Sequence, residues 1–412
     1  MTEPGPDTVK LYREDPTLEV FSARVLEVRD LGDEGIGIIL DRTAFYPEGG
    51  GQPADEGLLG EAEVFDVQEV DGTIVHYTDR PLEEGSEVEG SIDWGRRWDH
   101  MQQHTGQHLL SRVVLDEFDA VTRGFHLGPE ESTVDLSREL GPEDASLAQT
   151  RANLLVDADL PVRSRLVGRE DPAALEARKP PPEGVEEIRL VEIEGVDSVP
   201  CGGTHVPSTS RIGGIQILAG GNRKVHGLFR ISFICGGRLR RRLAFLDRLA
   251  NDLSHKLTTG PENFLERYGD MGEQVKDLKR EITDLRNVLI PLRTAALLEA
   301  AEAVGPARVV LARIDDLPPE TLPSVASALT AHPDVAALLG SEVAGTGRVI
   351  FARGEGLDLD MTEVLNGAAA VLGGGGGGSA GHATGGGPRG DALDAALMEA
   401  LDRVRSLLED EL

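Results

Sequence analysis

Residues 18–94 consist of short runs in which apolar and polar positions alternate, with Gly and Asp-Gly turns between them. The runs are rich in β-branched residues, as in LEVFSARVLEV, GIGIILD and EAEVFDVQEV. Alternation with a period of two is typical of strands that bury one face, and closely spaced turns favour antiparallel pairing. We therefore predict a small antiparallel β-barrel domain over residues 1–94.

From residue 95 the apolar positions recur at helical spacing, which places Trp98, Met101 and Leu109 on the same side of a predicted helix as two histidines. The arginines and glutamines at positions 96, 97, 102 and 103 are expected on another side. Strand-like runs and a second helix near residues 142–158 follow, and the region closes with GLFRISFICGG. This order predicts an α+β domain over residues 95–237.

A heptad-like rhythm runs through residues 238–304, interrupted by a turn signal at Gly260-Pro261. Its apolar positions are Leu239, Leu243, Leu246, Ala250 and Leu253, then Phe264, Tyr268, Met271, Val275, Leu278, Ile282, Leu285, Leu289 and Leu292. Narrow apolar seams on two helices are typical of a helical hairpin or of an intermolecular coiled coil. We expect a homodimer formed through this helical linker and the domain that follows it.

Residues 305–412 alternate between strand-like and helical runs, which predicts a small α/β domain and makes the whole chain a multidomain α+β protein. Six consecutive glycines, Gly373–Gly378, lie inside this domain. Composition alone favours a low-complexity linker. Alternatively, such a loop, followed by Pro388-Arg389, presents backbone amides to a phosphate group near a helix N-terminus.

The composition is strongly acidic, with 72 acidic against 41 basic residues and a formal net charge of -31. This excess is typical of a halophile's surface, because such self-repulsion is tolerated where salt shortens the Debye length to about 3 Å at 1 M. An acidic protein is a poor partner for a polyanion at ordinary salt, but in molar salt contacts to phosphate are weak whatever the sign. Net charge therefore neither requires nor excludes a nucleic-acid partner.

The sequence contains no run of about 18 apolar residues, and its first ten residues, MTEPGPDTVK, lack a basic start with an apolar run behind it. We expect a soluble, cytoplasmic protein with no membrane contact. Cys201 and Cys235 are the two cysteines, too few for a disulfide framework, so a thiol that binds a metal is the better interpretation for at least one of them.

Two pairs of side chains suggest a metal site. His104 and His108 are four residues apart, so on a helix both imidazoles lie on one face. Cys201 and His205 add a thiolate and a third imidazole, a mixture that zinc prefers. We predict one zinc ion per chain with these four ligands. A fully closed site is structural, whereas one labile ligand leaves room for water or substrate. In the second case zinc either lowers the pKa of a water to about 7 or holds the substrate while another water attacks.

The residues around the ligands restrict the chemistry. Thr105 stands where a zincin-type metalloprotease carries its glutamate, so a peptidase is not expected. His100 is a spare ligand candidate one turn earlier, and Cys235 is a small core residue. The residues that we expect to shape a tight pocket for a small amino acid are Thr105, Gln107, Gly202, Gly203 and Thr204. The alternative is that these residues serve ordinary helix and turn geometry.

Three glycines in a row, Gly49, Gly50 and Gly51, followed by Gln52, interrupt the strand-rich first region. Such a run weakens a strand, which suggests that the backbone approaches a ligand or another chain closely. A plain exposed loop is the equally weighted alternative.

The motifs FYPEGGGQP, DHMQQHTGQHLLS and CGGTHV, followed by TSRIGGIQIL and KVHGLFRISFICG, resemble the editing domain of alanyl-tRNA synthetases and the AlaX trans-editing proteins. The C-terminal region with its glycine-rich stretch resembles the DHH-associated domain that ends alanyl-tRNA synthetase and the long AlaX forms. With the acidic composition, the resemblance implies a long AlaX protein of a haloarchaeon.

The resemblance implies hydrolysis of the ester that joins serine or glycine to tRNA for alanine, with no role on DNA. By motif match it implies zinc bound by His104, His108, Cys201 and His205. It places Gln107 at a variable pocket position and gives Gly49, Gly50, Gly51 and Gln52 the task of enclosing the site. It also places substrate-sensing residues within Gly124–Gly128, which includes His126.

A separate editing site, which acts as a second sieve after aminoacylation, has a physical reason. The synthetase pocket gains only about 1–3 kcal/mol from a small difference in the size of the amino acid, whereas an editing site can reward the serine hydroxyl with hydrogen bonds. For the tRNA we expect stacking, shape and backbone contacts, with the glycine loop, Arg389 and the arginines at 238 and 240–242 as local contributors. Those four arginines can equally form a solvated helix face.

Three further expectations concern activity. Charging of tRNA is not expected, because the chain starts at the barrel. Phosphoesterase activity is not expected either, because the DHH motif is absent. A non-catalytic tRNA-binding dimer and a zinc hydrolase of small aminoacyl esters remain open as alternatives.

Overall fold

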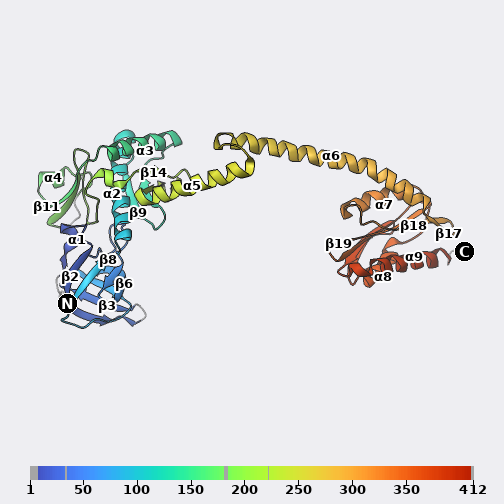
Figure 1. Cartoon of the computed structure of the whole chain (residues 1–412), viewed down its shortest axis with the longest axis horizontal. Helices are drawn as coiled ribbons and strands as arrows, with labels where there is room; N and C mark the ends of the chain where they lie inside the picture. The colour runs from blue at the N-terminus through green and yellow to red at the C-terminus, as the bar shows by residue number, and fades with distance from the viewer. Residues whose placement is uncertain (1–7, 33–34, 181–183, 221, 410–412) are drawn as a thin grey trace. The chain divides into compact units, whose positions relative to one another are not determined.

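The computed structural model describes residues 8–32, 35–180, 184–220 and 222–409. Residues 1–7, part of the N-terminal stretch that lacks a basic start followed by an apolar run, lie outside the described residues. The chain forms two compact units, residues 1–256 and 257–412, each with its own mixture of helices and sheets (Figure 1). The prediction of a multidomain α+β protein is confirmed. No helix in the described part of the chain is long and apolar enough to cross a membrane.

The first unit begins with a closed six-stranded barrel. Its strand order is β2-β3-β7-β6-β5-β8, and the strands are β2 (Val20–Asp30), β3 (Ile36–Leu40), β5 (Gly57–Leu59), β6 (Ala62–Val70), β7 (Thr73–Thr78) and β8 (Glu87–Ile92). β1 (Val9–Lys10) pairs in parallel with β4 (Arg42–Thr43) beside it, and α1 (Leu11–Glu14) follows β1. Alternate residues of β2, such as Phe21, Ala23 and Val25, point into the barrel core, as the period of two requires.

The helix α2 (Trp94–Phe118) follows the barrel and is the central element of the unit. Asp93 caps it by accepting a hydrogen bond from the backbone N–H of Arg96. Residues 100–111 are buried without interruption, although most of them are polar. Arg97, Gln102 and Gln103, which were expected on another side of the helix, are buried too, because other elements of the unit pack against α2.

Two sheets and a helix surround α2. One sheet has the order β14-β16-β10-β9, with β15 also on β16, and its strands are β9 (Thr122–Leu127), β10 (Ser132–Leu136), β14 (Ile215–Ile217), β15 (Arg223–Val225) and β16 (Leu228–Cys235). The other has the order β11-β12-β13, with β11 (Val162–Gly168), β12 (Glu187–Ile193) and β13 (Asp197–Pro200). The helical elements of this region are α3 (Pro142–Asp157), α4 (Pro172–Leu175) and η2 (Thr209–Ile212).

Glutamine side chains satisfy the hydrogen-bonding needs of the buried junction between α2 and β16. The amide of Gln103 donates to the carbonyl of Cys235 at 3.2 Å and accepts from its N–H at 2.8 Å, as a neighbouring strand would do. Gln102 accepts from the N–H of Gly237 and donates to the carbonyl of Arg211. Gly106 leaves space for the Cys235 thiol, since a Cβ there would overlap the sulfur. Cys235 is accordingly a buried core residue, as predicted.

Two helices, α5 (Gly236–Leu257) and α6 (Phe264–Glu299), occupy the heptad region, with η3 (Pro261–Asn263) between them. Their apolar residues are mostly exposed in the single chain, for example Leu246 and Leu278. Arg238, at the start of α5, is buried and bonds Asp99 of α2 through its Nε at 2.9 Å, so neither interpretation offered for the arginine cluster fits this residue. Arg240, Arg241 and Arg242 lie on the exposed part of the helix.

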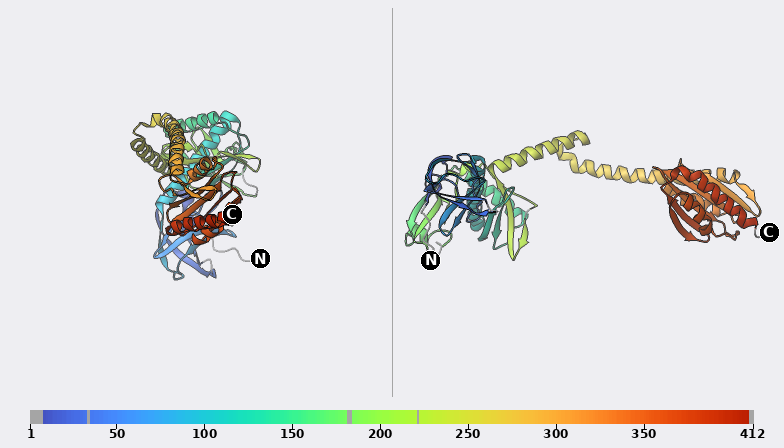
Figure 2. Two further views of the ribbon diagram at one scale, coloured as in Figure 1. Left: turned by 90° about the vertical axis from the view of Figure 1, so that its right-hand side faces the viewer. Right: turned by 90° about the horizontal axis from the view of Figure 1, so that it is seen from below.

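The second unit is built on a six-stranded sheet of order β17-β18-β19-β20-β22-β21, in which only β18 and β19 are parallel. Its strands are β17 (Glu302–Val304), β18 (Ala307–Arg313), β19 (Val335–Val343), β20 (Thr346–Arg353), β21 (Gly375–Ser379) and β22 (His382–Gly387). The helix α7 (Leu322–Thr330), preceded by η4 (Pro319–Thr321), covers one face of the sheet. The helices α8 (Met361–Val371) and α9 (Leu393–Glu409), the latter preceded by η5 (Gly390–Ala392), cover the other (Figures 1 and 2).

The six-glycine stretch is not a linker, because most of it is part of a β-strand. It supplies β21, the edge strand of the sheet, in a hairpin with β22. A Cβ at Gly376 would meet the Thr384 carbonyl and the Leu365 side chain, so part of the glycine content reflects close packing of the hairpin on α8. Composition suggested disorder because it carries no information on this packing.

Candidate metal centre

The four predicted ligands meet in the first unit. His104, His108, Cys201 and His205 each present one ligand atom, and these atoms all lie within 4.8 Å of one another. The Cys201 sulfur is 3.4 Å from His104 Nε2 and 3.3 Å from His205 Nε2. In tetrahedral zinc coordination, bonds of about 2.0–2.3 Å separate such atoms by about 3.5 Å, so the set fits a zinc ion.

The three imidazoles are suited to ligation because burial keeps them neutral. Burial, with smaller repulsion from Arg189, lowers the pKa of His104 from 6.5 to about 3. Burial and the neighbouring rings hold the pKa values of His108 and His205 well below their usual range. In the absence of a cation, burial raises the pKa of the Cys201 thiol. A divalent cation would reverse that cost by binding the thiolate.

Gln52 sets the tautomer of His104. Its Oε1 accepts from His104 Nδ1 at 2.8 Å and from the N–H of Thr204 at 3.1 Å, and its Nε2 donates to Thr204 Oγ1 at 2.9 Å. Because Nδ1 carries the proton, Nε2 of His104 is free to bind a metal. One buried amide thus aligns the first histidine and fixes the CGGTH segment.

The other two histidines have different surroundings. Nδ1 of His205 lies 3.1 Å from Thr105 Oγ1, which also accepts from the N–H of Val206 at 3.1 Å. Thr105 therefore holds the His205 ring with its Nε2 toward Cys201. His108 has a buried Nδ1 with no hydrogen-bond partner among the described residues. A buried nitrogen without a partner, close to the ligand atoms of His104, Cys201 and His205, fits a site that binds a metal ion.

The CGGTH segment approaches α2 closely enough to require glycine at one position. A Cβ on Gly203 would overlap the His104 ring and come within 2.8 Å of Gln52 Oε1, whereas a Cβ on Gly202 would meet nothing within 4 Å. Arg189 holds the segment from behind, since its Nη1 donates to the carbonyls of Cys201 at 3.0 Å and Gly203 at 2.9 Å.

A buried ion pair attaches the loop that contains Gly49, Gly50, Gly51 and Gln52, called the glycine-rich loop below, to α2. Arg97 of α2 and Asp55 are both fully buried, and Arg97 Nε lies 3.1 Å from both carboxylate oxygens. Arg97 also donates to the carbonyls of Pro16 and Ala44, and Asp55 accepts from the N–H of Tyr46. The loop that carries Gln52 is therefore fixed at both ends to the barrel and to α2.

Three of the four predicted ligands, His104, His108 and Cys201, line a pocket of about 330 Å³, and His205 does not. Gln107, Gly202 and Gly203 line the same pocket. Gly49 and Gly50 contribute from the glycine-rich loop. Gly51 does not line the pocket, but its carbonyl accepts from the N–H of Leu127 at 3.0 Å and so joins the loop to β9.

Several predicted site residues lie elsewhere. Thr105, Thr204 and Gln52 are buried behind the ligands and support them, and none of the three lines the pocket. His126 is exposed; its neighbour on β9, Phe125, lines the pocket instead, with its ring centroid 5.2 Å from that of His104. Arg389 is exposed in the second unit, before η5.

Sequence reasoning missed several pocket residues, namely Tyr12, Arg13, Tyr46, Arg178 and Lys179. Phe125 lies within the predicted segment Gly124–Gly128, and period-two alternation on β9 could have favoured it over His126, since adjacent strand residues face opposite sides. No comparable signal marks Lys179, which precedes a proline-rich segment. Burial, followed by the charge of Arg178, lowers the pKa of Lys179.

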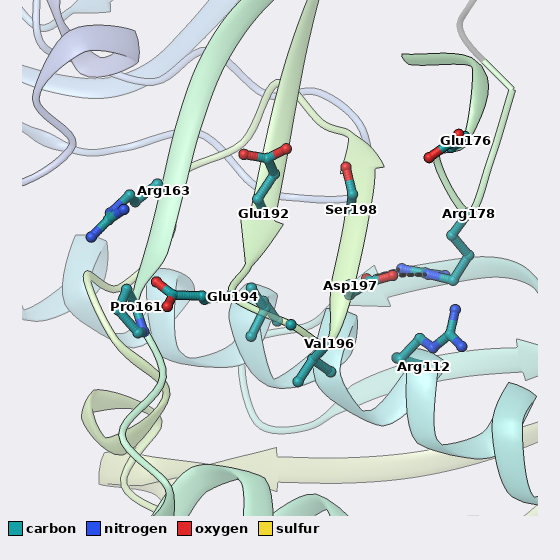
Figure 3. Close-up of a pocket in the computed structure, with 12 residues that line it drawn as sticks. Arg112, Pro161, Arg163, Glu176, Arg178, Glu192, Glu194, Val196, Asp197 and Ser198 are labelled. Atoms are coloured by element: carbon teal, nitrogen blue, oxygen red, sulfur yellow. Dashed lines mark hydrogen bonds and ion pairs between the residues drawn. The ribbon is translucent and has the colours of Figure 1, made fainter. Parts of the chain in front are cut away.

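A larger pocket of about 510 Å³ lies nearby on the β11–β13 sheet (Figure 3). Arg178 lines both pockets and forms a bidentate pair with Asp197, at 2.8 and 2.9 Å. Figure 3 shows these two side chains pointing at each other, with the Arg112 guanidinium beside them. None of the residues that line this pocket is a histidine or a cysteine, and the carboxylate of Asp197 anchors Arg178, the residue before Lys179.

Three segments match known families. Residues 10–96 match the class II (A) tRNA synthetases, residues 188–232 match the second additional domain of threonyl- and alanyl-tRNA synthetases, and residues 307–409 match the DHHA1 domain. The crystal structure of the C-Ala domain from Aquifex aeolicus alanyl-tRNA synthetase is similar to 26% of this chain and 96% of that chain, with 24% identity and a TM-score of 0.24.

Several curated proteins are similar over most of the chain. The alanyl-tRNA editing protein AlaX-L of Pyrococcus horikoshii is 32% identical over 367 residues, which cover 86% of this chain and 89% of that protein. The alanine–tRNA ligases of Ignicoccus hospitalis and Halorubrum lacusprofundi are each 33% identical, covering 86% and 98% of this chain. The chain spans only 38% and 44% of the length of these two ligases.

Proposed function

Because the chain belongs to the AlaX-L family of alanyl-tRNA editing proteins, we propose that it hydrolyses the ester between a wrong amino acid, serine or glycine, and tRNA for alanine. The observation that carries this proposal is the cluster of three histidines and one cysteine beside a pocket of about 330 Å³. The pocket has room for a small aminoacyl group with part of the terminal nucleotide.

We propose one zinc ion per chain, held by His104, His108, Cys201 and His205. The donor set and the spacing of about 3.4 Å between Cys201 and two ring nitrogens support this choice. Zinc bound there would supply Lewis acidity at the edge of the pocket. Gln52 and Thr105 would keep the rings of His104 and His205 in the orientation that binding requires.

The cations that line the pocket support an anionic substrate. Arg13, Arg178 and Lys179 line it together with two carboxylates, Glu48 and Glu69, and Arg178 is paired with Asp197. We therefore assign to Arg13 and Lys179 the local attraction of the phosphates at the 3′ end of a tRNA. The aromatic rings of Tyr46 and Phe125 offer surfaces for stacking of the terminal base.

We also propose that the second unit, which matches the DHHA1 domain, contributes to binding of the tRNA body. The exposed apolar stripes of α5 and α6 support a homodimer through these helices. We place the protein in the cytoplasm of a halophilic organism, as its charge favours.

The test is deacylation of serine-charged and alanine-charged tRNA for alanine in molar potassium chloride. The wild type is expected to release serine and to spare alanine. The Cys201→Ala variant is expected to lose zinc and activity, whereas Cys235→Ala, at the other cysteine, serves as the matched control. Full activity of Cys201→Ala would refute the metal assignment.

Two outcomes would favour the alternatives. Binding of tRNA without release of serine would indicate a non-catalytic binding protein. Equal hydrolysis of serine methyl ester and of the charged tRNA would indicate a hydrolase of small esters that does not use the tRNA body.

A further inference from the structure

Gln107 has an unusual position in the pocket wall. It precedes the ligand His108, lines the pocket and is 2% exposed. Its Nε2 donates to Ser111 Oγ at 2.6 Å, one helical turn later. Its Oε1 is buried and has no hydrogen-bond partner among the described residues.

A second hydrogen bond holds this arrangement in place. Ser111 is buried, and its hydroxyl also accepts from Thr122 Oγ1 of β9 at 2.8 Å. The Gln107 amide is therefore held against Ser111, which Thr122 of β9 holds in turn, and with Nε2 on Ser111 the oxygen Oε1 is the unpaired end of the amide. Buried acceptors are seldom left unpaired, so this oxygen points to a donor supplied by the ligand.

The charges of the pocket indicate which donor is expected. The carboxylates that line the pocket, Glu48 and Glu69, are both exposed and so lie toward solvent. An α-ammonium group is costly to desolvate and is better placed near these charges. Gln107 lies between His104 and His108 on α2, and its amide oxygen is a neutral acceptor, which suits a neutral hydroxyl.

We propose that Gln107 Oε1 accepts a hydrogen bond from the side-chain hydroxyl of an esterified serine and thereby makes the pocket selective for seryl over glycyl and alanyl esters. This inference rests on the proposed function and deepens it. Glycine and alanine leave the buried oxygen unpaired, and a site that loses one such bond discriminates by about tenfold to a hundredfold. Thr122 and Ser111 are positioning residues that fix the acceptor.

The test compares wild type, Gln107→Leu and Thr122→Val with serine-charged and glycine-charged tRNA for alanine. Gln107→Leu is expected to lower the serine-to-glycine ratio of kcat/KM about tenfold to a hundredfold. Thr122→Val is expected to lower the same ratio by a smaller factor. Gln216→Leu, which removes a partly buried glutamine of β14 that does not line the pocket, is the matched control.

A binding measurement makes the result independent of turnover. Calorimetry with non-hydrolysable 3′-amide analogues of seryl- and glycyl-adenosine should show the same change in the serine-to-glycine ratio. Equal loss for both substrates, with zinc content unchanged, would overturn the role of Gln107. If the wild type hydrolysed neither charged tRNA, the proposed function would fail, and the analogue-binding ratio would still decide whether Gln107 reads the hydroxyl.

Discussion

Replacing Gln52 by leucine should weaken zinc binding although Gln52 is not a ligand. Gln52 is fully buried, and its Oε1 accepts a hydrogen bond from His104 Nδ1 at 2.8 Å. Leucine has a similar size but accepts no hydrogen bond, so the His104 ring loses its fixed tautomer and orientation. Removal of such a supporting group typically reduces metal affinity about 10–100-fold, or about 1.4–2.7 kcal/mol.

The same substitution should also reduce the stability of the first unit. It leaves His104 Nδ1 and both the N–H and the hydroxyl of Thr204 without their present partner. Each buried group left unpaired costs about 1–3 kcal/mol. Gln52→Glu retains an acceptor for His104 and for the N–H of Thr204, so it is expected to recover most of the zinc affinity.

Affinity is measured by competition with a chromophoric zinc chelator at neutral pH, and folding is monitored in parallel by circular dichroism. Gln68→Leu serves as the control, because Gln68 is a partly exposed glutamine on β6 that bonds only Glu48 and Asp66. Wild-type affinity in a folded Gln52→Leu protein would refute the reasoning. An equal loss in Gln68→Leu would do the same, since it would trace the effect to general destabilisation.

Three further predictions follow from contacts in the first unit. Gly203→Ala should abolish zinc binding in the chelator assay because its Cβ overlaps the His104 ring, while Gly202→Ala, which meets nothing within 4 Å, should bind normally; similar behaviour of the two would contradict the close approach. Arg97→Met should lower the free energy of unfolding in urea by about 3–5 kcal/mol, with part recovered when Asp55→Leu is added, and a loss under about 1 kcal/mol would show that the buried pair is not needed. Burial lowers the pKa of His76 from 6.5 to about 4, so the unfolded chain takes up a proton first as the pH falls. In the metal-free protein His76 should therefore contribute up to about 3 kcal/mol to the stability that is lost between pH 6.5 and pH 4, beside the losses from the other buried histidines, and His76→Gln should reduce that slope by this amount in urea titrations at several pH values.

The cluster of three histidines and one cysteine was predictable from sequence because its signal is local. A helix brings His104 and His108 to one face whatever surrounds it, and Cys201 and His205 stand at the same spacing of four residues in a second short segment. The groups that support them were not predictable, because they act across long sequence separations. Gln52 reaches Thr204 across 152 residues, and no periodicity records such a contact.

Thr105 shows how adjacency in sequence misleads. It was predicted in the pocket because it follows His104, but neighbours on a helix point about 100° apart. Thr105 accordingly lies behind the ligands and bonds His205. The glycine stretch misleads in the opposite way, since its composition suggests disorder and only its pairing with β22 shows a strand.

The partners of α2 also determine the order of events in folding. Gln103 bonds the backbone of Cys235 across 132 residues, and Cys201 reaches His104 across 97. Closing loops of this length costs chain entropy before any contact repays it, so such pairs form late. A metal ion at the proposed site would then bind in a pocket that the surrounding sheets have already assembled. In this respect the protein would differ from a zinc finger, in which metal binding drives the chain to fold.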